Sequence, residues 1–171
     1  MTGVQTCALP ISTAEIAAGL GLEPGDIGFD GHEPSVFSAG APFLFVPVRS
    51  LDAISRASPG IIPWATKDGP ATFVYTRESE RAGSAYHARM FASAWGVYED
   101  PATGSAVAAF AGVVQAFDRP RDGESMLTIE QGFEMGRPSM IALGLVVEND
   151  ALVSATIGGS VVIVSSGSLD L

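Results

Sequence analysis

One acidic residue and three small residues stand together where a turn leads into an apolar run. Asp100 is followed by a proline, and Thr103, Gly104 and Ser105 precede an uncharged stretch, residues 106–117. Proline keeps the residue before it extended, and small polar residues suit the first turn of a helix. The free amides of a helix N-terminus bind anions, and a glycine lets a ligand approach the backbone closely. The spacing therefore predicts an anion site at Gly104 and Ser105, beside the carboxylate of Asp100.

The same stretch has a purely structural interpretation. A helix that is apolar on all its faces is normally buried all round. At 106–117 it is too short to cross a bilayer, which needs about 20 apolar residues. In this interpretation Thr103 or Ser105 caps the first turn, and Asp100 performs no chemistry. Spacing alone favours this second interpretation, because short motif matches often mislead.

Longer motifs around this turn resemble a known family. Residues 99–106 read Glu-Asp-Pro-Ala-Thr-Gly-Ser-Ala, residues 88–91 read Ala-Arg-Met-Phe, and residues 130–132 read Glu-Gln-Gly, with Met-Gly-Arg-Pro-Ser following at 135–139. In this order they are similar to the PhzF-like, phenazine biosynthesis-type isomerases, from about Thr13 to the C-terminus. The resemblance implies an α+β fold like that of diaminopimelate epimerase. Each half of such a protein is a curved sheet or barrel around one helix, and the active site lies between the halves.

The resemblance also implies a chemistry. It is a proton transfer on a small carboxylate substrate that needs no cofactor and no metal. A glutamate removes the proton from carbon and returns it elsewhere. By residue match Asp100 is the catalytic residue of this chain, which orients the substrate and helps to move the proton. Thr103, Gly104 and Ser105 then bind the substrate.

Only one of the family's two halves is recognisable. The N-terminal half carries the glutamate with a Gly-Asn-Pro motif and a Gly-His-Ala-Thr motif, and neither occurs here. We therefore expect residues 13–171 to be the C-terminal domain alone, inactive without its N-terminal partner. Related epimerases of this fold use two thiols, one beside this turn, but no cysteine stands at 100–102. The remaining alternative is a non-catalytic domain for small-molecule binding or assembly.

Composition narrows the class of partner. The 171 residues are 47% apolar and 16% charged, which predicts one globular domain with a sizeable core. The net charge of −10 argues against a nucleic-acid or anionic-membrane surface. A single cysteine excludes an internal disulfide and a cysteine metal cluster. We expect a cytoplasmic protein, and a homodimer because a domain face without its partner promotes association.

The first twelve residues differ from the rest. Residues 1–12 hold Cys7 but no basic region and no long apolar core, so they are unlike a secretory signal. They resemble translated adapter sequence and are expected to be either foreign to the gene or a poorly ordered extension.

The remaining elements follow from periodicity and turn residues. Arg89, in an alternating run, is expected to pair with an acidic neighbour or to serve a substrate anion. His32 and His87 lack the spacing of metal ligands. We expect antiparallel strands curled about the 103–117 helix. The predicted helices are 13–20 and 50–57, the predicted strands are 35–38, 43–48, 72–76, 85–91, 124–130, 139–147, 152–157 and 160–164, and 61–69 is a predicted loop.

Overall fold

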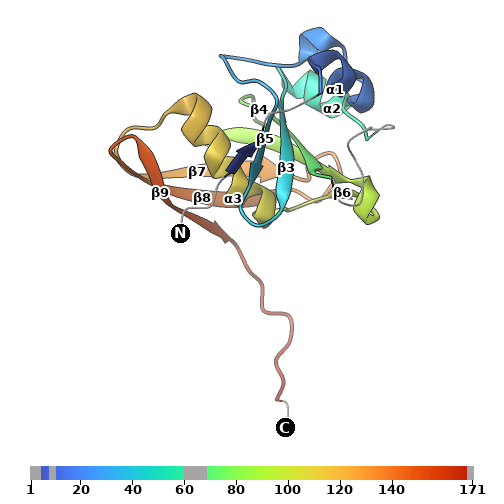
Figure 1. The fold of residues 1–171 in the computed structure, drawn as a ribbon. Helices are drawn as coiled ribbons and strands as arrows, with labels where there is room; N and C mark the ends of the chain where they lie inside the picture. The colour runs from blue at the N-terminus through green and yellow to red at the C-terminus, as the bar shows by residue number, and fades with distance from the viewer. Residues whose placement is uncertain (1–4, 8–10, 60–68, 169–171) are drawn as a thin grey trace.

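The computed structural model describes residues 5–7, 11–59 and 69–168, the first three by their backbone only. Figure 1 shows a curled sheet with short helices on both of its faces and a C-terminal segment that projects from the body. The predicted 61–69 loop lies almost wholly outside the described residues. The strands are β1 (Gln5–Cys7), β2 (Ser35–Ser38), β3 (Pro42–Pro47), β4 (Ala71–Thr76), β5 (Tyr86–Ala92), β6 (Val97–Asp100), β7 (Gly123–Gln131), β8 (Ser139–Glu148) and β9 (Ala151–Gly159). The helices are α1 (Thr13–Leu20), α2 (Leu51–Arg56) and α3 (Gly104–Val113), with 3₁₀ turns η1 (Pro24–Asp26) and η2 (Ser93–Trp95) and a π-helical turn η3 (Val114–Asp118).

Within the described residues the strands form one mixed sheet in the order β1-β2-β3-β4-β5-β7-β8-β9, and β6 also pairs with β5. The prediction of a wholly antiparallel sheet was wrong, because β3 pairs with β4 and β5 pairs with β7 in parallel. Parallel neighbours need a crossover connection, and α3 lies in the one that joins β5 to β7. The helix that the sequence emphasised is therefore part of the crossover that this parallel pairing needs.

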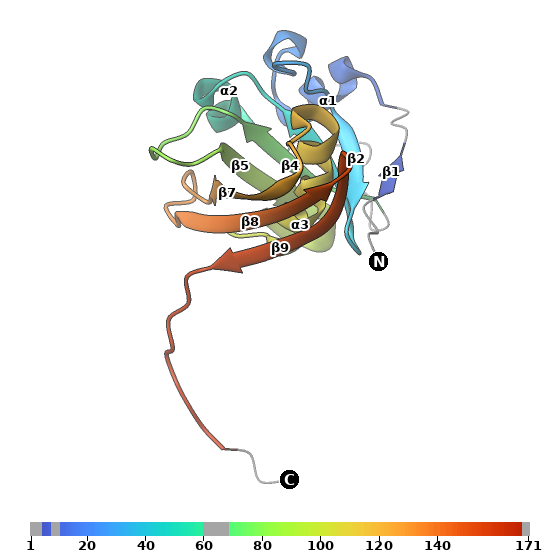
Figure 2. The same ribbon diagram turned by 90° about the vertical axis from the view of Figure 1, so that its left-hand side faces the viewer.

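The sheet buries both faces of its middle strands (Figure 2). In β3, Phe43 and Phe45 join the core that contains α3, whereas Leu44 and Val46 join the core formed with α1 and α2. Successive side chains of a strand point to opposite faces, so a strand buried on both sides reads as a continuous apolar run. This explains the run at residues 43–48, which the sequence predicted as a strand.

The helix α3 begins at Gly104 and continues through the π-helical turn to Asp118. Val107 and Phe110 are fully buried, and the Phe110 ring packs against the rings of Tyr75 and Tyr86 with centroids 4.8 and 5.0 Å away. The exposed positions of the first turn are Gly104 and Ser105. The helix therefore presents its N-terminal turn to solvent and its body to the core.

The capping residues in the sequence correctly predicted where α1 and α2 begin. Ser12 and Glu15 form the reciprocal capping box that begins α1, with the Glu15 amide 3.3 Å from the Ser12 hydroxyl and the Ser12 amide 2.9 Å from the Glu15 carboxylate. Ser50 caps α2 in the same manner by accepting the Ala53 amide at 3.1 Å.

At the N-terminal end Gln5–Cys7 pairs with β2, and the prediction for residues 1–12 stays a prediction. The C-terminal end differs from expectation. The predicted strand at 160–164 was wrong: β9 ends at Gly159, and the side chains of 161–164 are 84–89% exposed. Gly159 pairs with Ile141, close to the first residue of β8, so little backbone remains opposite the residues that follow. None of the described helices has the length and apolar character needed to cross a membrane.

Candidate active site

The turn before α3 is positioned by one edge of β5. Strand β7 runs parallel to β5 and ends with Gln131 opposite Ala88, whereas β6 runs antiparallel and ends with Asp100 opposite Met90. The two strands thus share this edge end to end, and their C-terminal ends meet at the level of Arg89. This brings together motifs that lie about thirty residues apart in the chain.

The carboxylate of Asp100 lies beside the first turn of α3 but does not cap it. It accepts a hydrogen bond from the Thr103 hydroxyl at 2.6 Å. Thr103 occupies the N-cap position, but its side chain accepts no amide of the helix. The expectation that Thr103 or Ser105 caps the helix was therefore wrong for Thr103, because its hydroxyl donates to Asp100 instead. Ser105 is exposed, and no described residue forms a hydrogen bond with its hydroxyl.

A buried amide holds this turn in place. Gln131 is 0% exposed, and its Nε2 donates to the Asp100 carbonyl at 2.6 Å and to the Thr103 hydroxyl oxygen at 3.0 Å. Its Oε1 accepts the Thr103 amide at 3.2 Å. An unsatisfied buried amide is costly, so these three bonds fix both the turn and the side chain that holds it. In the sequence Gln131 is part of the Glu-Gln-Gly motif, but the motif alone does not reveal its role. The available signal was a single glutamine between a predicted strand and a glycine.

The next residue, Gly132, fits against the turn from the other side. Its φ is +80°, and a Cβ placed there would lie 2.5 Å from the Arg137 carbonyl oxygen and 2.7 Å from that of Pro101. Only glycine permits this approach. The Glu-Gln-Gly motif is thus a support for the 100–104 turn.

Arg89 pairs with an acidic neighbour, as one of its two interpretations predicted. Its Nε and Nη2 each donate to the Glu99 carboxylate at 2.8 Å. Its Nη1 donates to three carbonyls at the end of α2, those of Ile54, Ser55 and Ala57, at 2.7–3.2 Å. A two-point arginine–carboxylate pair of this kind fixes direction as well as distance. Arg89 therefore ties the residue before Asp100 to the opposite face of the sheet.

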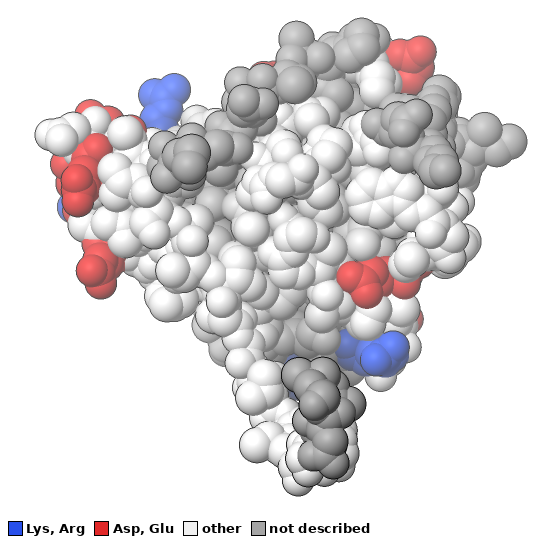
Figure 3. All heavy atoms as spheres, turned by 60° about the horizontal axis from the view of Figure 1, so that its bottom comes forward, with Lys and Arg blue, Asp and Glu red and all other residues white. Residues whose placement is uncertain are grey.

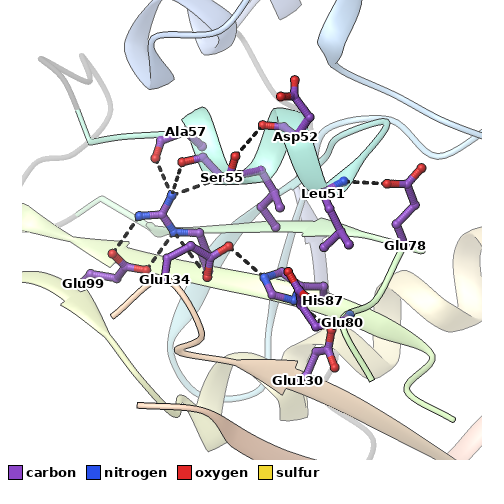
Figure 4. Close-up of polar contacts among 12 residues, drawn as sticks. Leu51, Asp52, Ser55, Ala57, Glu78, Glu80, His87, Glu99, Glu130 and Glu134 are labelled. Carbon is purple, nitrogen blue, oxygen red and sulfur yellow. Dashed lines mark hydrogen bonds and ion pairs between the residues drawn. The ribbon is translucent and has the colours of Figure 1, made fainter. Parts of the chain in front are cut away.

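His87 lies two residues earlier on β5, between two carboxylates (Figure 4). Its Nδ1 is 2.9 Å from Glu130 and its Nε2 is 2.9 Å from Glu134. Burial by itself would lower the pKa of His87, but the hydrogen bonds to Glu134 and Glu130 outweigh it and raise the pKa above its usual value. The sequence places His87 in the predicted 85–91 strand but reveals no partner for it, because Glu130 and Glu134 are distant in the chain.

The far end of α3 carries a second buried polar cluster. Asp118 accepts hydrogen bonds from Arg77 and Tyr86, and His32 Nε2 lies 2.9 Å from it. The His32 ring stacks against Phe29 and Phe117 with centroids 4.7 and 5.0 Å away. Asp118 and Arg77 also line an open pocket of about 430 Å³, whose other walls are Val114, Phe117, Pro120, Ser125, Leu127 and Leu145.

In this second cluster the neighbours of Asp118 stabilise its carboxylate. Burial alone would raise the pKa of Asp118, but the hydrogen bonds from His32 and Tyr86 and the positive charge of Arg77 lower it. Burial and the bond to Asp118 together raise the pKa of Tyr86. Among the described residues no group of three or more His, Cys, Asp or Glu side chains is arranged to hold a metal ion.

Few charged side chains lie on the side of the molecule where α3 begins. Figure 3 brings the lower side of Figure 1 forward and shows uncharged atoms across the middle of that face. Trp95, Val97 and Tyr98, just before the turn, are 41–64% exposed.

The sheet half-barrel with few helices is the fold of PhzF-type proteins. A phenazine biosynthesis protein of the PhzF family from Bacillus anthracis superposes on 95% of this chain and 59% of its own, with a TM-score of 0.77 and 22% identity. The sequence profile of the phenazine biosynthesis-like (PhzC-PhzF) family matches residues 3–167, so the chain belongs to that family.

Two curated relatives support this assignment. An uncharacterized isomerase of Mesorhizobium japonicum is 46% identical over 164 residues, which are 90% of this chain and 53% of the relative. The trans-2,3-dihydro-3-hydroxyanthranilate isomerase of Pseudomonas aeruginosa is 35% identical over 126 residues, 74% of this chain and 42% of the relative. The chain thus spans about half the length of the curated relatives that it matches.

Proposed function

We propose that this chain is the C-terminal half of a cofactor-independent PhzF-like isomerase that transfers a proton on a small carboxylate substrate. The supporting observation is the open first turn of α3: Gly104 and Ser105 are exposed, and the Asp100 carboxylate is fixed beside them. The substrate carboxylate binds the amides of this turn and the Ser105 hydroxyl. The isomerase names of two relatives agree with this class of reaction.

In this proposal Asp100 is the acid–base or substrate-orienting group of the half. The Thr103 hydroxyl and the Gln131 amide hold the turn from behind, so Asp100 can reach the substrate without a change of the helix end. Thr103 contributes to binding by orienting Asp100, because its hydroxyl already lies within hydrogen-bond distance of Asp100 and Gln131. A glutamate from a second half supplies the base that this half lacks.

Proton–deuterium exchange tests the assignment. The pure chain, incubated in D₂O with trans-2,3-dihydro-3-hydroxyanthranilate, should exchange no carbon-bound proton by NMR. Co-expression with the part of the Mesorhizobium japonicum relative that this chain does not match should give exchange. Exchange by the pure chain, or none after a stable complex has formed, contradicts the proposal.

Two variants of the complemented protein separate binding from proton transfer. Ser105→Ala removes one hydrogen bond to a charged group, worth about 1.5–3 kcal/mol, and should weaken binding about ten- to hundredfold. Asp100→Asn can still accept the Thr103 hydroxyl but loses the charge and the proton, so turnover should fall by about 10²–10⁴. Unchanged turnover in Asp100→Asn, measured by steady-state kinetics, removes Asp100 from the catalytic residues.

One observation favours the alternative of an assembly domain. The side chains of Val161, Val162, Ile163 and Val164 are 84–89% exposed, which is unusual for four consecutive branched residues. A homodimer, or a complex with the missing N-terminal half, would cover such a surface. Light scattering of the pure chain tests this alternative: a concentration-independent monomer that also fails to bind the complementing half contradicts it.

A further inference from the structure

A continuous row of charged groups leads from His87 to the residue before Asp100. His87 Nε2 lies 2.9 Å from Glu134 Oε1, and Glu134 Oε2 lies 3.9 Å from Arg89 Nε. The same Arg89 Nε donates to Glu99 Oε1 at 2.8 Å. All four side chains are mostly buried, with exposed fractions of 1% for His87, 19% for Glu134, 9% for Arg89 and 8% for Glu99. In the view of Figure 4, the labelled Glu134 lies between Glu99 and His87.

A proton on both ring nitrogens of His87 allows both of its contacts to be hydrogen bonds. Each nitrogen faces a carboxyl group, and a carboxylate can only accept. Glu130 is fixed in its place, because it also accepts the backbone amides of Glu80 and Arg81. Glu134 stands on the 132–138 loop, and its carboxylate is held by its own backbone and by the side chains of His87 and Arg89, whereas Glu130 is held by the amides of another segment. The charged groups around the imidazole are Glu130 from β7, Glu134 from the loop, Arg89 from β5, and Arg81, which stacks on Phe133 beside the ring.

Glu134 and Glu99 compete for one N–H group. Arg89 Nε donates to Glu99 Oε1 at 2.8 Å, and Glu134 Oε2 is 1.1 Å farther from the same nitrogen, at 3.9 Å. When His87 loses its proton, one ring nitrogen presents a lone pair to a carboxylate and the attraction becomes a repulsion. Glu134 then gains by moving toward the arginine, and Glu99 loses part of its two-point pair. Because Glu99 directly precedes Asp100 in β6, we expect a shift of Glu99 to displace the backbone of the 99–104 turn.

We propose that Glu134 is a positioning residue, held away from Arg89 by protonated His87, and that the proton on His87 thereby sets the position of the 99–104 turn. The hydrogen bonds to Glu134 and Glu130 raise the pKa of His87 above its usual value, which favours the protonated form. The consequence for catalysis rests on the proposed function, since it needs Asp100 to act on a substrate. The structural coupling does not need a substrate.

The test uses the present chain and NMR spectroscopy. We expect the amide signals of Asp100, Thr103 and Gly104 to shift with pH at the same midpoint as the His87 ring signals. In Glu134→Gln, a neutral side chain of the same shape, His87 should still titrate while the turn signals no longer follow it. Glu124→Gln, an exposed acid at the other end of β7, is the matched control and should leave the coupling unchanged.

Two results overturn the proposal. One is a wild-type turn whose amide signals stay fixed while His87 titrates, and the other is a Glu134→Gln variant whose turn follows His87 as before. If Glu134→Gln fails to fold, Arg89→Lys gives the second measurement, because lysine keeps the charge but cannot form the two-point pair. Its turn signals should be displaced at every pH, and undisplaced signals contradict the proposal. A failure of exchange chemistry in the complemented protein would instead contradict the proposed function and leave this coupling intact.

Discussion

The two ends of α3 are built in opposite ways. At its start Gly104 and Ser105 are exposed. The nearby side chains of Asp100, Thr103 and Gln131 bind one another and the backbone of residues 100 and 103, and the N-cap side chain accepts no amide of the helix. At its end the π-helical turn brings Asp118 into a buried cluster with His32.

This difference shows which end is available to a ligand. Every helix leaves about four backbone amides without partners in its first turn. A protein that uses a helix only as core normally satisfies them with a capping side chain, as Ser12 and Ser50 do for α1 and α2. The side chain at the N-cap of α3 is turned away. The open end thus differs from the other two helices of the described chain in the feature that would bind an anion.

The largest loss of stability should come from a substitution at the C-terminal end of α3, where Asp118 lies in the buried cluster. Asp118→Ala leaves the His32 ring, the Tyr86 hydroxyl and Arg77 without their shared acceptor. His32 and Tyr86 are buried, and each buried polar group left unsatisfied costs about 1–3 kcal/mol. Asp30→Ala is the control, because this exposed carboxylate lies 3.7 Å from the same arginine. Urea unfolding measures both. Equal losses of stability would show that the cluster is no more than a surface ion pair.

A smaller loss of stability is expected from a substitution at Gly132, which packs against the turn before α3. Gly132→Ala brings a Cβ within 2.7 Å of two carbonyl oxygens, whereas Gly136→Ala, also at positive φ, meets nothing within 4 Å. The second variant carries only the backbone cost, about 1–2 kcal/mol. The first should cost about 1–3 kcal/mol more, as overpacking does, and should displace the Thr103 amide signal. Equal unfolding midpoints would contradict the close fit of Gly132 against the turn.

The pH dependence of stability separates the two clusters. His87 has a folded pKa raised above its usual 6.5, so its contribution is complete below about pH 6.5 and is lost as the pH rises through the folded value. Asp118 has a folded pKa lowered below 3.8, so its contribution is complete above that value and is lost as the pH falls through the folded pKa. We expect His87→Gln to flatten the stability curve above pH 6.5, and Asp118→Ala to flatten it at acid pH. A His87→Gln curve that still falls above pH 6.5 as in the wild type would assign that loss to another group.

The smallest effect is expected at Ser105. Its side chain is exposed, and no described residue forms a hydrogen bond with its hydroxyl, so Ser105→Ala should change the free energy of unfolding by less than about 0.5 kcal/mol. The same substitution should weaken substrate binding in the complemented protein. A stability loss of more than about 1 kcal/mol would identify Ser105 as a helix cap and remove the strongest reason to regard this end as open.

Much of the local structure was predictable from neighbouring residues. Ser12 with Glu15, and Ser50 before an apolar period, located the starts of α1 and α2, and the proline after Asp100 with Gly104 located the start of α3. The prediction of a strand at 160–164 was wrong because it also depended on local composition alone. Its apolar, β-branched composition favours an extended backbone, but a strand also needs a partner, which composition does not reveal.

The sequence by itself determined the family motif, the short helices, most strands and the candidate residues Asp100, Gly104 and Ser105. Each depends on residues within a few positions of one another. Only the tertiary structure decided that Gln131 holds the turn, that Arg89 serves Glu99 rather than a substrate, and that His87 lies between two carboxylates. These contacts arise because β6 and β7 share one edge of β5, and a parallel crossover is set by the packing of α3 on the sheet. Packing joins residues that are distant in the chain, and no local pattern encodes which of several acids a buried cation will meet.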